Sequence, residues 1–99
     1  MTISIKLVSN NEYEVTVQSK TLTTHLVTLS DEVHKNLTNE KVTKEELLDF
    51  SFKFLLDKEP NTSIMSSFEL TVISKYFSNY EKSVEKWCSF WHRFDTVRQ

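Results

Sequence analysis

The stretch Thr43–Pro60, TKEELLDFSFKFLLDKEP, decides the fold of this chain. Thr43 and Glu46 have the spacing of a capping box, in which each side chain accepts a hydrogen bond from the backbone N–H of the other residue. Pro60 marks the far end, because the residue before a proline is pushed out of the helical region of backbone conformation. The stretch therefore predicts a helix over residues 43–58.

This helix is apolar around most of its circumference. At about 100° per residue, the Leu and Phe side chains between residues 47 and 56 cover roughly 240° of the helix surface. A helix on a protein surface needs only about a 100° apolar stripe. We therefore expect the helix to be central, with other elements packed on at least two of its sides.

The residues before this helix have the alternation that is typical of strands. Apolar side chains occupy every second position in Ile3–Leu7 and in Tyr13–Val17, as expected for strands with one buried face. The chain contains no Gly, so the Asn residues of Ser9–Asn11 are expected to supply the left-handed turn between them. A third strand is expected at Leu22–Leu29, and its two apolar faces favour a central position in the sheet or a position under a helix. The pattern predicts a three-stranded antiparallel β-meander over residues 1–29.

The remainder of the chain is predicted to be helical. A short helix is expected at Asp31–Leu37, and another at Glu69–Phe77 from its apolar pairs at i,i+4 spacing. From Tyr80 onward, aromatic side chains recur at steps of three and four residues, which indicates a helix with an aromatic seam. The expected fold class is α+β, as a single domain over residues 1–99. The meander packs on one side of the central helix, and the later helices of the helical part (30–99) cover the other.

Composition excludes several classes of function. The chain has 99 residues, a formal net charge of −2 and a single Cys. A nearly neutral chain has no overall field that would attract nucleic acid or an anionic membrane. The lack of Gly excludes the phosphate-binding loops and the nucleophile elbow that depend on it. With one Cys, no signal-peptide run and no long apolar stretch, we expect a cytoplasmic protein away from the membrane. Because the sequence contains no catalytic constellation, we expect neither a cofactor nor enzymatic activity.

The segment Thr23-Thr24-His25 is the first candidate binding site, because it places two hydroxyl groups and an imidazole on one strand. His25 could also meet Glu32 and His34 in a metal site, but no established ligand spacing fixes that geometry. We therefore predict no metal, with His25 as a polar strand residue and His34 as an exposed helix residue. The alternative function for this segment is a binder of a small ligand or a metal around Thr24 and His25.

The C-terminal helix is the second candidate, with Trp87, Trp91 and Arg93 as its binding residues. Residues 75–99 contain five Lys or Arg against three acidic residues, so this region is mildly basic. The aromatic seam could stack on single-stranded nucleic acid, dock a protein partner or a second copy, or pack on its own core. Because the excess of positive charge is small, a protein partner or self-association is favoured over nucleic acid.

Cys88 and His92 lie at i,i+4 spacing on the same helix, as a nucleophile and its base could. Such a pair also needs an orienting third group and an oxyanion pocket, and one helix does not supply them. Cys88 is therefore expected to be a small buried apolar residue.

Several motifs together resemble a group of small uncharacterised prokaryotic proteins over about residues 13–80. They are Thr23-Thr24-His25-x-Val27-Thr28, Ser30-Asp31, Glu45-Glu46-Leu47, Ser51-Phe52-x-Phe54-Leu55-Leu56, Glu59-Pro60-x-x-Ser63-Ile64 and Val72-Ile73-x-x-Tyr76-Phe77. The resemblance implies a stand-alone domain and transfers no activity. Most of the shared positions are core or capping residues, whereas His25 has no structural role in the sequence pattern. The aromatic C-terminal seam and the absence of a catalytic constellation in the sequence instead predict a non-enzymatic protein-interaction or regulatory module that could form a homodimer.

Overall fold

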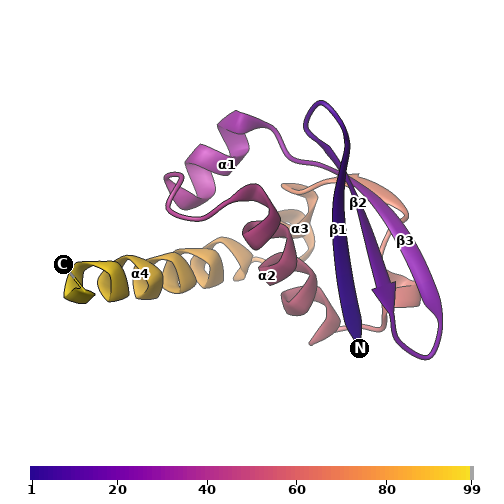
Figure 1. Cartoon of the computed structure of the whole chain (residues 1–99). Coiled ribbons are helices and arrows are strands. Elements are labelled where there is room, and N and C mark those ends of the chain that lie inside the picture. Colours follow the sequence, from indigo (N-terminus) through magenta and orange to yellow (C-terminus); the bar gives the residue numbers. More distant parts are fainter. Residues whose placement is uncertain (99) are drawn as a thin grey trace.

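The computed structural model describes the fold of residues 1–98 and the side chains as far as Ser89. Over this range the fold is α+β, with a four-stranded mixed sheet on one side and helices on the other (Figure 1). Its elements are, in chain order, β1 (Thr2–Ser9), β2 (Glu12–Gln18), β3 (Leu22–Thr28), α1 (Asp31–Thr38), α2 (Lys44–Leu56), the 3-10 helix η1 (Asn61–Ser63), β4 (Ser67–Glu69), α3 (Val72–Tyr76) and α4 (Tyr80–Arg98).

The first three strands form the antiparallel meander that the alternation predicts. Asn11 has a φ of 62° in the turn between β1 and β2, so an Asn does replace the missing Gly there. Val15 and Val17 of β2 and Val27 of β3 are completely buried on the inner face. The predicted central position of β3 is confirmed, since it lies between β2 and β4.

The fourth strand was not predicted, and it changes the sheet from antiparallel to mixed. β4 pairs in parallel with β3 and places Phe68 opposite Val27. The predicted helix Glu69–Phe77 is therefore wrong at its start, because Glu69 ends the strand and α3 begins only at Val72. Phe68 is 8% exposed, and its ring lies 6.1 Å from that of Phe52, so the core holds this segment extended. The part after residue 30 is consequently not purely helical.

The capping box of α2 is present as the sequence predicts. The backbone N–H of Glu46 donates to Thr43 Oγ1 at 3.0 Å, and that of Thr43 donates to Glu46 Oε1 at 2.8 Å. The helix ends at Leu56, two residues earlier than expected, and Asp57 is its C-cap. Its central position is confirmed, because α2 lies between the sheet and α4 (Figure 1).

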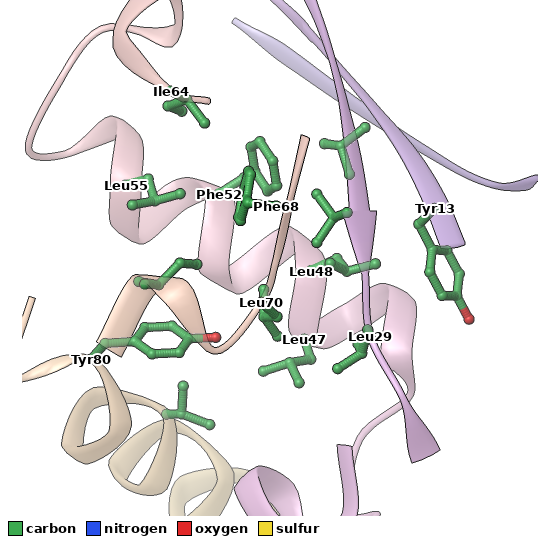
Figure 2. Close-up of a cluster of buried hydrophobic side chains, with 14 of the residues drawn as sticks. Tyr13, Leu29, Leu47, Leu48, Phe52, Leu55, Ile64, Phe68, Leu70 and Tyr80 are labelled. Atoms are coloured by element: carbon green, nitrogen blue, oxygen red, sulfur yellow. The ribbon is translucent and has the colours of Figure 1, made fainter. Parts of the chain in front are cut away.

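Two hydroxyl groups meet inside the core between α2 and α4. Ser51 Oγ donates to the carbonyl oxygen of Leu47 at 2.7 Å and lies 2.5 Å from the hydroxyl of Tyr80. Because the Ser51 proton is already used, Tyr80 must donate to Ser51. Figure 2 shows the Tyr80 ring entering the apolar cluster from α4. Burial raises the pKa of Tyr80 well above its ordinary value.

Replacing Tyr80 with Phe should change how stability depends on alkaline pH. Since the folded protein keeps the Tyr80 hydroxyl neutral, Tyr80 contributes stability below pH 10 that is lost as the pH rises above the unfolded pKa of 10.0. The difference in unfolding free energy between parent and Tyr80→Phe should therefore shrink above pH 10 by up to about 1.4 kcal/mol per pH unit. Urea unfolding of both proteins from pH 8 to 11 measures it. If the difference in unfolding free energy stays constant over this pH range, the Tyr80 hydroxyl is not held buried and neutral in the folded protein.

Candidate functional site

His25 lies inside the molecule and belongs to a chain of hydrogen bonds. It is 2% exposed, and its Nδ1 lies 2.7 Å from the carbonyl oxygen of Met65. A carbonyl can only accept, so the Nδ1 proton donates to it and Nε2 is the acceptor in the neutral ring. The Thr23 hydroxyl, 2.9 Å away, then donates to Nε2. The structure thus gives His25 the structural role that the sequence pattern lacks.

Asn61 extends this chain to the turn between β2 and β3. Its side-chain amide donates to Thr23 Oγ1 at 2.9 Å and to the carbonyl oxygen of Thr21 at 2.8 Å. Asn61 is 5% exposed, so it holds η1 against the sheet instead of acting as a helix cap. We call the chain of Asn61, Thr23, His25 and the Met65 carbonyl the polar bridge. It joins β3 to the segment between α2 and β4.

The three residues of the strand candidate do not form one surface. Thr23 and His25 point to the inner face and belong to the polar bridge. Thr24 is exposed on the outer face, opposite Thr16 of β2. A ligand on the outer face would therefore meet Thr24 without reaching the imidazole.

The start of the C-terminal seam packs on the molecule's own core. Tyr80 and Val84 are completely buried, and the Trp87 ring is half-buried and stacks on Phe50 at a centroid distance of 4.5 Å. Trp91 and Arg93 lie outside the side chains that the structure describes. The first turns of α4 thus stabilise the fold.

The remaining titratable candidates are held in structural positions. His34 Nε2 donates to the carbonyl oxygen of Val42 at 2.6 Å, so it is not a free exposed side chain. Among the described residues, no group of three His, Cys, Asp or Glu side chains could hold a metal ion. Cys88 is 4% exposed, and burial raises the pKa of its thiol, as suits a small apolar core residue. His92 is outside the described side chains.

An apolar cavity of about 390 Å³ lies where the end of α2 meets η1, β4 and α3. Tyr76 is 69% exposed and Met65 41% exposed, so the cavity opens to the surface beside them. Its charged lining residue is Glu59, and Ser63 and Tyr76 add hydroxyl groups. The lining residues are Leu55, Glu59, Ser63, Ile64, Met65, Phe68, Val72, Ile73, Tyr76 and Phe77. We call this feature the apolar cavity.

The polar bridge holds one wall of the apolar cavity in place through Met65. Met65 is one of the residues that line the cavity, and its carbonyl oxygen accepts a hydrogen bond from His25. The position of this wall therefore depends on a buried imidazole that does not line the cavity. Sequence reasoning missed the cavity, although the i,i+4 pairs Val72/Tyr76 and Ile73/Phe77 did mark the apolar side of its helix.

A second, more polar depression lies at the turn between β1 and β2. Lys44 is one of its lining residues, and Lys44 Nζ lies 2.6 Å from Asp31 Oδ1 and 2.9 Å from Asn11 Oδ1. The hydrogen bond and charge of Lys44 lower the pKa of Asp31. Because these polar groups satisfy one another, the depression is explained as a link between the hairpin turn and the starts of α1 and α2.

No family model, curated protein or solved structure matches this chain. The resemblance to small prokaryotic proteins therefore stays a prediction. In the part of the chain that the structure covers, no helix has the length and apolar character to cross a membrane.

Proposed function

We propose that this chain is a non-enzymatic protein-interaction module that holds an apolar side chain of a partner in the apolar cavity. The observation that carries the proposal is the cavity itself, about 390 Å³ in volume and bordered by the exposed Tyr76 and Met65. Ligand sites are usually concavities of roughly this size, with mainly apolar walls and few polar groups. The proposed compartment is the cytoplasm, as the single Cys of the sequence predicts.

The rim residues suit contact with a protein. Tyr is enriched among the residues that dominate binding energy at interfaces, because it combines a large apolar area with a hydroxyl group. Met adapts its flexible side chain to partners of different shape. Both are substantially exposed here, although large apolar side chains are costly to leave in water. A partner that covers them would gain free energy from their burial.

The charge of the cavity specifies the partner further. Glu59 is the charged residue of the lining, and it is partly buried. A carboxylate beside an apolar wall favours a partner in which Lys or Arg neighbours the apolar anchor residue. We therefore propose a peptide segment with one large apolar residue next to a basic one.

The residue types that line the apolar cavity are consistent with the non-enzymatic role that we propose. It combines one carboxylate and two hydroxyl groups with no His, Cys or Lys among the residues described as lining the cavity. An acid–base or nucleophilic mechanism needs a nucleophile and a base within hydrogen-bond distance of each other. We therefore propose that these residues bind a partner without changing it chemically.

Nucleic acid is the alternative partner, and Trp87 gives it little support. Stacking on a base needs an aromatic face that is free, whereas Phe50 already lies against the Trp87 ring. The alternative then depends on Trp91 and Arg93, outside the described side chains. Loss of binding with added salt would distinguish it from the apolar cavity.

Selection from a peptide library tests the proposed function. The purified protein should enrich peptides that have one large apolar residue next to Lys or Arg. For a selected peptide, Tyr76→Ala and Met65→Lys should each weaken binding at least about tenfold, as measured by fluorescence anisotropy. Glu59→Gln should weaken peptides with the basic residue more than those without it.

The matched control is Leu22→Ala, which removes another exposed apolar side chain from the opposite face of the sheet. Leu22 is 57% exposed, so its replacement should leave both folding and peptide affinity unchanged. Enrichment of no peptide, or equal affinities for Tyr76→Ala and Leu22→Ala, would contradict the proposed function.

A further inference from the structure

Strand β1 is an edge of the sheet within the described part of the chain, and its apolar side chains are incompletely covered. Ile3 and Ile5 are half-buried, whereas Val17 and Val15 opposite them are completely buried. The contrast is largest at the next pair, where Leu7 is 55% exposed and Tyr13 only 5%. The apolar inner face of the sheet thus continues to β1 but loses its cover there.

We propose that the chain forms a two-fold symmetric homodimer in which β1 pairs antiparallel with β1 of a second copy, with Ile5 on the two-fold axis. The two sheets then join into one continuous sheet. This inference does not depend on the apolar cavity, because β1 contributes no residue to its lining.

The sequence of β1 matches itself in this register. Antiparallel pairing about Ile5 places Leu7 opposite Ile3 of the second copy, and Ile5 opposite Ile5 of the second copy. The apolar residues of the inner face therefore meet apolar residues. On the outer face, Lys6 lies opposite Ser4 of the second copy. The pairing is regular over residues 3–7, which are centred on Ile5, and it ends where the irregularity of β1 begins after Leu7.

Neighbouring registers match less well. An axis through Lys6 would place two ammonium groups directly opposite each other, which is destabilising. An axis through Ser4 would place Leu7 opposite Met1, which lies before the strand. A shift of the pairing by one residue would set the apolar face of one copy against the polar face of the other. The register through Ile5 is therefore favoured on both faces.

The usual protections of an edge strand do not block this register. Charged residues and bulges commonly prevent pairing at an edge. The irregularity of β1 lies between Leu7 and Ser9, at the end of the strand, and Lys6 would face a small neutral residue. Figure 1 shows α2 alongside β1. A two-fold axis perpendicular to the sheet would place the two α2 helices on the same face, one on each side of the junction.

Opposite charges at Ser4 test the register. In the dimer, Ser4→Glu would face Lys6 of the second copy twice and form two ion pairs, whereas Ser4→Lys would create two repulsive pairs. Sedimentation equilibrium at low salt should show the parent moving with concentration from 11.7 kDa toward twice that mass. We expect about three- to tenfold tighter dimerisation for Ser4→Glu and a similar weakening for Ser4→Lys.

Thr24→Glu and Thr24→Lys are the matched controls, because Thr24 is exposed on the same outer face but lies on β3. Both should dimerise like the parent, and melting temperatures report that each variant is folded. A parent that stays at 11.7 kDa up to its solubility limit would overturn the proposed dimer. Equal dissociation constants for Ser4→Glu and Ser4→Lys would overturn the β1 register. Either result leaves the peptide-binding proposal testable by its own variants.

Discussion

Replacement of Phe52 by Ala is expected to lower the free energy of unfolding by about 3–5 kcal/mol, because it leaves a cavity at the centre of the core. Phe52 is completely buried and lies between two other rings, with centroids 5.5 Å from His25 and 6.1 Å from Phe68. Figure 2 shows Phe52 beside Phe68 in the middle of the apolar cluster. Truncation of Phe52 therefore removes contacts to both β3 and β4.

Leu55→Ala should have a similar effect, about 2–5 kcal/mol, since Leu55 is 4% exposed on the same helix. A domain of this size has a total stability of about 5–15 kcal/mol, so either change removes a large part of it. Thermal melting should show a decrease of roughly 15–30 °C for Phe52→Ala. Lys53→Ala is the matched control on α2, because its side chain is 66% exposed. If Phe52→Ala and Lys53→Ala melt within a few degrees of each other, α2 is not the centre of the core.

The sequence was sufficient for those parts of the fold that depend on local interactions. The capping box of Thr43 and Glu46 involves residues three positions apart, and the alternation of β1 and β2 is visible within each strand. The expected helix Asp31–Leu37 is found at Asp31–Thr38 for the same reason. Each of these features is set by neighbours along the chain.

The features that sequence reasoning missed depend on contacts between distant residues. β4 has three residues, which is too short for an alternation to be recognised, and the residues of β3 that pair with it lie forty-one positions earlier. The role of Asn61 also depends on distant residues, because its side-chain amide donates to Thr21 and Thr23, about forty residues earlier in the chain. The apolar cavity combines four elements, and none of them alone has a pattern that indicates a concave surface.

The polar bridge gives the second large effect. His25→Leu replaces the imidazole with an apolar side chain of similar volume and so removes both ring nitrogens. The carbonyl oxygen of Met65 then loses the donor that His25 supplies, and the hydroxyl of Thr23 loses the acceptor for its proton. Because an unsatisfied buried polar group costs about 1–3 kcal/mol, we expect a loss of stability of about 2–4 kcal/mol. Urea unfolding at neutral pH measures this loss.

Thr24→Ala is the matched control, because Thr24 neighbours His25 in sequence but is exposed on the other face. Its effect on stability should stay within about 0.5 kcal/mol. If His25 had only a ligand-binding role, His25→Leu would leave stability unchanged or raise it, since a buried polar group would be replaced by an apolar one. Such a result would show that the polar bridge does not stabilise the fold.

The same variant links the fold to the proposed function. Met65 lines the apolar cavity, and its carbonyl oxygen is held by His25. Under conditions where His25→Leu is still folded, it should therefore bind a selected peptide more weakly than Thr24→Ala does, although His25 is not one of the residues that line the cavity. Unchanged peptide affinity in a destabilised but folded His25→Leu would show that the polar bridge stabilises the fold without positioning the cavity wall.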